Sequence, residues 1–146
     1  MNDIGTLGAE YSVAYALNDS GQIVGNSAHL GGQDHAFLYS NGQMIDLGTL
    51  GGDTSNAYGI NNLGVVAGYS YDSAVNFLGF MYQNGTMTPL GTLVGTWSIA
   101  HAINDQNQIA GHAYTRNNRA AHAFRPTSGQ LADPGTPSRP HCPAPP

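Results

Sequence analysis

A repeat of 43 residues runs through most of this 146-residue chain. One copy begins at Asp3 with Asp-Ile-Gly-Thr-Leu-Gly, the next at Asp46 with Asp-Leu-Gly-Thr-Leu-Gly, and a third at Pro89 with Pro-Leu-Gly-Thr-Leu-Val. Later landmarks keep the same phase, with one extra residue in the third copy before its phenylalanine: Asn18, Asn61 and Asn104; Gly25, Gly68 and Gly111; Phe37, Phe80 and Phe124. Periods of this length are typical of solenoids, propellers and other arrays of stacked units.

Each repeat predicts four short β-strands. In the second copy we expect them over residues 56–61, 65–70, 78–82 and 87–91, where apolar and β-branched residues alternate with turn signals. Turn signals every 8–12 residues are the pattern of all-β folds. No segment keeps a 3.6-residue apolar period long enough to indicate a helix.

The turn residues indicate that successive strands are antiparallel neighbours. The segments 18–21 and 61–64 place Asn first and Gly fourth, which fits a type I turn followed by a left-handed residue. In the third copy Asn107 stands at the glycine position, and Asn tolerates positive φ. The pairs Asn41-Gly42 and Asn84-Gly85 are signals for type I′ hairpins. Each repeat therefore reads as a four-stranded meander, which is the blade of a β-propeller.

The fold class that follows is all-β, with tandem four-stranded antiparallel blades that form a partial or oligomer-completed β-propeller. Residues 1–132 hold the three repeats (3–45, 46–88 and 89–132), and residues 133–146 form a Pro-rich tail that we expect to be disordered. Closed propellers have four to eight blades. The three repeats are therefore part of a longer array, an open stack, or a unit of which several copies together form a closed ring. We expect self-association through open blade edges, and pairing of residues 3–7 with the strand around 123–125, within one chain or across two.

Composition excludes some partners. The formal net charge is −5, there is no Lys, and the four Arg residues all lie beyond position 115. This balance predicts no binding to nucleic acid. No run of about 18 apolar residues occurs, so no membrane insertion is expected, and the N-terminus lacks the features of a signal peptide. The single cysteine, Cys142, excludes an internal disulfide and a cysteine-type metal site.

These motifs resemble those of the HAF-repeat family, a group of extracellular bacterial repeat proteins. The His-Ala-Phe motif stands at residues 35–37 and 122–124, while the second copy departs with Leu-Gly-Phe at 78–80. The Asp-Leu-Gly-Thr-Leu-Gly-Gly motif is intact at 46–52, and Ile-Asn-x-x-Gly-x-Val-x-Gly spans 60–68. The resemblance covers residues 3 to about 132. It implies an exported, propeller-like repeat protein at the cell surface or outside the cell, and it carries over no catalytic residues.

The polar residues of the repeats favour structural roles over chemistry. Repeat-phased histidines such as His35 and His122 usually fill the same niche in each unit, and no metal-binding spacing such as His-x-x-x-His occurs. Acids at the repeat starts and in the turns are expected to cap backbone N–H groups. The Gly-rich segment 48–52 lacks the Lys-Ser or Lys-Thr of a phosphate loop. We therefore predict no catalytic, cofactor-binding or metal-binding residues and no cofactor.

Aromatic residues are the better functional lead, because they can stack on sugar rings, although packing between blades also explains them. The third copy departs most from the repeat, and the residues that we expect to face a ligand lie there: Trp97, His101, His112 and Tyr114, with Arg116 and Arg119 nearby. The predicted function is a non-enzymatic extracellular binding or scaffold module for carbohydrate or another protein. One alternative is a propeller enzyme of lyase or hydrolase type, with its site at the central channel of a larger assembly. Another is a fragment of a longer repeat protein without an independent role.

Overall fold

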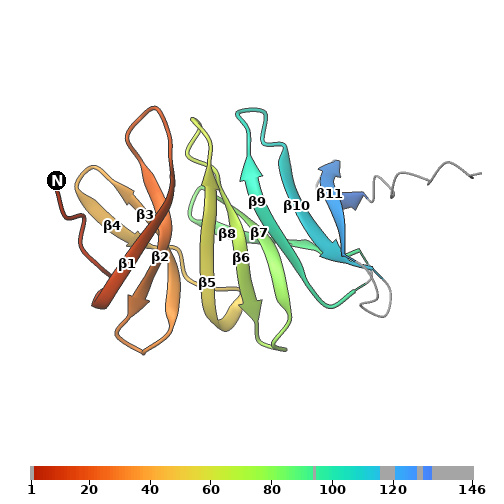
Figure 1. Ribbon diagram of the computed structural model, residues 1–146, viewed down its shortest axis with the longest axis horizontal. Helices are drawn as coiled ribbons and strands as arrows, with labels where there is room; N and C mark the ends of the chain where they lie inside the picture. The colour runs from red at the N-terminus through yellow and green to blue at the C-terminus, as the bar shows by residue number, and fades with distance from the viewer. Residues whose placement is uncertain (1, 94, 116–120, 128–129, 133–146) are drawn as a thin grey trace, which may run out of the picture.

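The computed structural model describes residues 2–93, 95–115, 121–127 and 130–132. This part of the chain is all-β and holds three four-stranded antiparallel sheets, without a helix among the described residues (Figure 1). Sheet 1 contains β1 (Gly8–Leu17), β2 (Ile23–His29), β3 (Asp34–Ser40) and β4 (Gln43–Asp46). Sheet 2 contains β5 (Gly51–Ile60), β6 (Val66–Asp72), β7 (Phe77–Gln83) and β8 (Thr86–Gly91). Sheet 3 contains β9 (Ser98–Ile103), β10 (Ile109–Tyr114), β11 (Ala121–Thr127) and β12 (Gln130–Ala132).

The tight turns have the backbone conformation that their Asn and Gly residues predict. Asn41 and Gly42 have φ of 51° and 80°, and Asn84 and Gly85 repeat these values within one degree, at 51° and 79°. Positive φ at both central residues confirms the type I′ hairpins between β3 and β4 and between β7 and β8. In the turn after β9, Asn107 takes a φ of 57° where the other copies use Gly. The strand order within each sheet therefore follows the order in the chain.

The first hairpin of every sheet carries a β-bulge at the same position. The pairing of β1 with β2 shifts around Tyr15, that of β5 with β6 around Tyr58, and that of β9 with β10 around His101. A bulge leaves one residue without a partner on the neighbouring strand and bends the strand locally. The repeat thus places three unpaired residues at equivalent positions of the three sheets.

The hydrophobic core lies between the sheets. One buried cluster joins sheets 1 and 2 and includes Val24, Ala36, Ala57, Val66 and Phe80. A second cluster joins sheets 2 and 3 and includes Ala67, Leu90, Ala100, Ile109 and Phe124. Figure 1 shows the sheets following one another in a row, so sheet 2 is covered on both faces.

A chain of hydrogen bonds joins the first turn of each sheet to the next. The side-chain amide of Asn18 donates to the carbonyl oxygen of Asn61 at 2.9 Å, and that of Asn61 donates to the carbonyl oxygen of Asn104 at 2.9 Å. Each Asn also accepts two backbone N–H groups of its own turn; Asn61 accepts those of Leu63 and Val65. The same side chain therefore stabilises its turn and sets the spacing between sheets.

The predicted pairing of residues 3–7 with β11 is wrong within one chain. Residues 125–127 of β11 pair with β12, and Leu7 instead forms a parallel bridge to His29 of sheet 1. The equivalent segment after Asp46 explains the difference, because Gly48 and Gly51 take positive φ and turn the chain from one sheet to the next. After Asp46 the motif is thus a connection between sheets, whereas in the third copy its first residues, 89–91, end β8, as predicted for the fourth strand of sheet 2. The predicted tail, residues 133–146, lies outside the described residues.

Candidate binding face

Three bulge residues form a row across the sheets. The ring of Tyr15 lies 5.2 Å from that of Tyr58, measured between centroids, and the ring of Tyr58 lies 5.8 Å from that of His101. Tyr15 is 49% exposed and Tyr58 is half-buried. Because bulges re-aim side chains and recur near functional sites, this row is the first element of a candidate site.

Six rings, including those of Tyr58 and His101 from this row, form a closed circuit of contacts. Tyr58 contacts Tyr69 at 5.8 Å, Tyr69 stacks on Phe77 at 3.9 Å, and Phe77 lies 6.0 Å from Trp97. Trp97 lies 5.0 Å from His112, whose ring stacks on His101 at 4.9 Å. The contact between His101 and Tyr58 completes the circuit. We call these six residues the aromatic circuit: Tyr58, Tyr69, Phe77, Trp97, His101 and His112.

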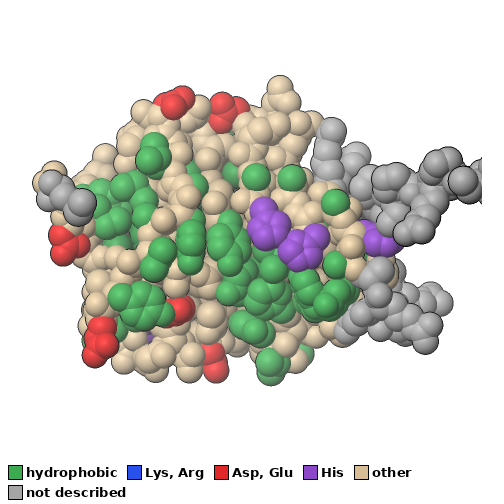
Figure 2. Space-filling model, viewed as in Figure 1, with side chains coloured by type: hydrophobic (Ala, Val, Ile, Leu, Met, Phe, Trp, Pro, Cys, Tyr) green, Lys and Arg blue, Asp and Glu red, His purple; other side chains and the backbone are tan. Residues whose placement is uncertain are grey.

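The circuit lies on an accessible side of the molecule. His101 is exposed, and the other five side chains are partly exposed. Figure 2 shows hydrophobic and histidine side chains gathered across the middle of the face that Figure 1 shows with β1, β5, β6, β9 and β10. Flat, partly exposed rings next to polar backbone are suited to contact an apolar face of a ligand.

The four residues expected to face a ligand come together here. Trp97 precedes β9, His101 lies in β9, and His112 and Tyr114 lie in β10. The ring of Tyr114 lies 4.0 Å from that of Trp97, and its backbone N–H donates to the carbonyl oxygen of Trp97. Arg116 and Arg119 lie outside the described residues. The structure thus gathers all four residues into one cluster, whatever their role.

The contribution of sheet 2 to the circuit was missed from the sequence. Tyr58, Tyr69 and Phe77 were not among the residues expected to face a ligand. The signal was nevertheless present in the repeat. Tyr58 stands 43 residues before His101, and Tyr69 stands 43 residues before His112. Aromatic or imidazole rings in phase at both positions indicate a shared surface of two adjacent sheets.

Burial alters the protonation of several rings. It raises the pKa of Tyr69 to about 12, with smaller contributions from Tyr58 and Tyr71. Burial also raises the pKa of Tyr58. The pKa of His112 is lowered, first by burial and then by the charge of His101, whose Nε2 lies 2.9 Å from Nδ1 of His112. At neutral pH the circuit is therefore uncharged at these three groups.

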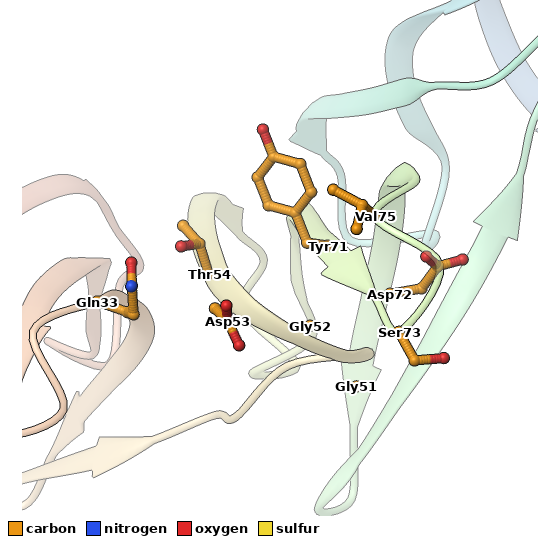
Figure 3. Close-up of a pocket in the computed structure, with 9 residues that line it drawn as sticks. All are labelled: Gln33, Gly51, Gly52, Asp53, Thr54, Tyr71, Asp72, Ser73 and Val75. Carbon is orange, nitrogen blue, oxygen red and sulfur yellow. The ribbon is translucent and has the colours of Figure 1, made fainter.

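A groove of about 400 Å³ adjoins the circuit. Tyr71 joins the two, because its ring lies 5.2 Å from that of Phe77 and also lines the groove. Figure 3 shows Gln33 on a hairpin of sheet 1 facing Asp53 and Thr54 of sheet 2, with the ring of Tyr71 beyond them. The groove is lined by Gln33, Gly51, Gly52, Asp53, Thr54, Tyr71, Asp72, Ser73 and Val75.

The two carboxylates of this groove have different roles. Asp72 accepts hydrogen bonds from the side chain and backbone N–H of Asn76, and these bonds lower its pKa. Its carboxylate therefore holds the turn after β6. The Asp53 side chain forms no hydrogen bond within the described part of the chain, and it stays available to a ligand hydroxyl.

A second polar cluster lies in sheet 1, at His29, His35 and Asp46. Nδ1 of His35 lies 2.9 Å from Oδ2 of Asp46, and Nε2 of His29 lies 3.9 Å from the same oxygen. One ligand atom from each residue falls within 4.8 Å of the others. Sequence spacing did not reveal the cluster, because β2, β3 and β4 bring together residues that show no recognised metal-binding pattern along the chain.

Comparison with protein-family models, curated proteins and solved structures gave no match for this chain. Among the described residues, no helix is long and apolar enough to cross a membrane.

Proposed function

We propose that this chain is a non-enzymatic extracellular repeat module of the HAF type that binds a neutral carbohydrate on its aromatic circuit. The observation that carries the proposal is the closed contact of six partly exposed rings across two sheets. The extracellular setting rests on the resemblance of the repeat motifs to that family.

The chemistry of the face favours sugar over a charged or purely apolar ligand. Aromatic faces match the C–H-rich faces of pyranose rings, and polar groups around them pair with hydroxyls. The adjoining groove offers such groups in Gln33, Asp53 and Thr54, next to the ring of Tyr71. With no Lys and few Arg residues in the chain, an anionic ligand has little to attract it.

Binding can be followed by the fluorescence of Trp97, because this is the chain's only tryptophan. Neutral oligosaccharides of glucose, galactose and N-acetylglucosamine are titrated into the full chain. We expect saturable quenching or a spectral shift with at least one of them. Tyr58→Ala should weaken that affinity about fivefold, since one aromatic contact contributes about 1 kcal/mol.

The matched control is Tyr11→Ala, which removes an exposed tyrosine outside the circuit. Its affinity should equal that of the wild type. Thermal unfolding of both variants separates loss of contact from loss of fold. If no oligosaccharide changes the Trp97 signal, or if both variants lose affinity equally, the carbohydrate proposal fails.

We also propose that copies of the chain associate face to face to complete a propeller-like assembly. Val24 and Ala67 are fully buried between sheets, whereas Ala110, at the equivalent position of sheet 3, is exposed. On the other face Ala57 is fully buried, whereas its equivalent Ala14 in sheet 1 is exposed. The face of sheet 3 that no described sheet covers therefore has the chemistry of a face that packs against another sheet. The outer face of sheet 1, which holds Ala14, has the chemistry of its partner.

Light scattering coupled to size exclusion tests this association. We expect a discrete oligomer whose mass falls to that of a monomer in Ala110→Glu, because a carboxylate would be buried unpaired at the interface. Leu63→Glu, in an exposed turn of sheet 2, is the control and should leave the mass unchanged. A wild-type monomer at all concentrations contradicts the proposal.

A further inference from the structure

We propose that His29, His35 and Asp46 bind a divalent transition-metal ion of zinc type at the end of sheet 1 where β2 and β4 end and β3 begins. Two imidazoles and one carboxylate are ligands that Zn²⁺ prefers, and three protein ligands leave a fourth position for water or another donor. This site is separate from the aromatic circuit and does not depend on the function proposed for it.

The separations of the ligand atoms suit a metal ion once at least one of the two stacked imidazole rings rotates, because a metal lies in the plane of each ring that binds it. Ligands of a tetrahedral zinc at about 2.0–2.1 Å from the ion lie roughly 3.3 Å from one another. The distances from Oδ2 of Asp46 to Nδ1 of His35 and to Nε2 of His29, 2.9 and 3.9 Å, fall on either side of this value. The two imidazole rings are stacked 4.6 Å apart at an angle of 12°. All three side chains are at least partly exposed, so rotation of a side chain can adjust the ligand positions.

The repeat does not need these histidines. In sheet 2 the positions 43 residues later, 72, 78 and 89, hold Asp, Leu and Pro, and the same four-stranded sheet forms. Asp46 has a structural explanation, because its Oδ1 accepts the N–H of Gly48, as Asp3 accepts that of Gly5. The histidine pair beside it has no such counterpart in sheet 2. His35 and Asp46 recur in the third copy as His122 and Asp133, whereas the equivalents of His29 are Asp72 and Thr115. Of the three copies, only the first therefore has two histidines and one carboxylate at these positions, which marks a local role.

Protons oppose the metal, which makes binding depend on pH. The N–H of Gly31 donates to Nδ1 of His29 at 3.2 Å, so the neutral ring carries its proton on Nε2, the atom that faces Asp46. Ligation through Nε2 moves that proton to Nδ1 and breaks the exposed bond to Gly31. The metal must also displace the hydrogen bond between His35 and Asp46. We expect acid to weaken binding, because protons compete with the metal ion for the imidazole nitrogens.

Calorimetric titration of Zn²⁺ into the full chain tests the site, and the visible absorption of bound Co²⁺ reports its ligands. We expect one site per chain, with affinity lowered about tenfold or more in His35→Leu and in Asp46→Asn. Leu is the residue that sheet 2 has at this position, and Asn keeps the acceptor for Gly48, so both variants are compatible with the fold. Thermal unfolding without metal should show that both variants fold like the wild type.

The matched control is His112→Gln, which removes a histidine from the other pair and should bind Zn²⁺ like the wild type. No binding to the wild-type chain overturns the proposal. So does equal binding by His35→Leu, and so does loss of binding in His112→Gln alone, which would place the metal at the aromatic circuit instead.

Discussion

The carbonyl oxygen of Asn56 occupies the space where a Cβ on Gly68 would stand. The same contact recurs between Val13 and Gly25. It recurs again in sheet 3, where Ile99 faces Gly111. In each case the carbonyl belongs to the first strand just before its bulge, so the glycine of the second strand makes the bulge possible. The bulge in turn carries Tyr15, Tyr58 or His101 onto the candidate binding face.

Replacing Gly68 with Ala should therefore destabilise the fold severely. The added methyl group would overlap backbone and not a side chain, so relief requires the strand to move. We expect the free energy of unfolding to fall by about 3 kcal/mol or more, measured by urea denaturation. Gly31→Ala is the control, because its Cβ would meet only Nδ1 of His29 at 3.4 Å. A small loss in Gly68→Ala would mean that the bulge is adaptable.

The hydrogen bonds between turns predict a difference between two equivalent asparagines. Asn61 is 3% exposed and donates to Asn104 of the next sheet. Asn61→Asp removes this donor and places a negative charge against a carbonyl oxygen, which should cost about 3 kcal/mol. Asn104→Asp makes the same change in an exposed turn of sheet 3 and should cost less than about 1 kcal/mol. Thermal and urea unfolding compare the two, and equal losses would contradict a role for the bond between sheets.

Local chemistry made much of the fold predictable. The residues Asn41-Gly42 and Asn84-Gly85 specify type I′ turns because they tolerate positive φ at both central positions, and the structure has these turns. The sequence also shows that Gly68 recurs at the same position of each repeat. It does not show why glycine is needed there, because the carbonyl of Asn56 comes close to Gly68 only when the two strands pair. The antiparallel four-stranded sheets follow from such local signals.

Long-range contacts were harder to predict. The residues His29, His35 and Asp46 come together only when three strands pair in register. The segment 3–7 was expected to pair as a strand, as its repeat equivalent at 89–91 does in β8, but Gly5 and Gly8 take positive φ and Leu7 bridges to His29 instead. Of the aromatic circuit, Trp97, His101 and His112 were noted from their irregularity, whereas Phe77 gave no signal. Ring contacts across sheets depend on the stacking distance, which no local pattern encodes.

The raised pKa of Tyr69 predicts loss of stability at high pH. The unfolded chain ionises near the ordinary tyrosine pKa of about 10, whereas burial raises the pKa of Tyr69 in the fold to about 12. Between these values the native state holds more protons than the unfolded state, so the free energy of unfolding falls as pH rises. Urea unfolding across this range should show the decline, and phenolate absorbance should show late ionisation.

Tyr69→Phe is the variant that tests this assignment. It should reduce the decline at high pH, because the titrating group is gone. At neutral pH the free energy of unfolding of this variant should be about 1 kcal/mol lower, since it lacks the hydroxyl that accepts a hydrogen bond from the Asn56 side chain at 2.8 Å in the wild type. An unchanged decline above about pH 10 would place the effect on Tyr58 or Tyr11, whose pKa values are also raised.

The pair of His101 and His112 predicts the opposite pH dependence, a free energy of unfolding that falls as the pH is lowered. Burial and then the charge of His101 lower the pKa of His112, so the unfolded chain takes up a proton at higher pH than the fold does. The free energy of unfolding should therefore fall as pH drops through about 6.5 toward the lowered pKa. His112→Tyr, which installs the residue that sheet 2 has at the equivalent position, should flatten this part of the profile. Other ionisable groups are common to the wild type and His112→Tyr, so the test is the difference between their two curves of unfolding free energy against pH, measured by urea unfolding. Identical slopes of the two curves would contradict the prediction.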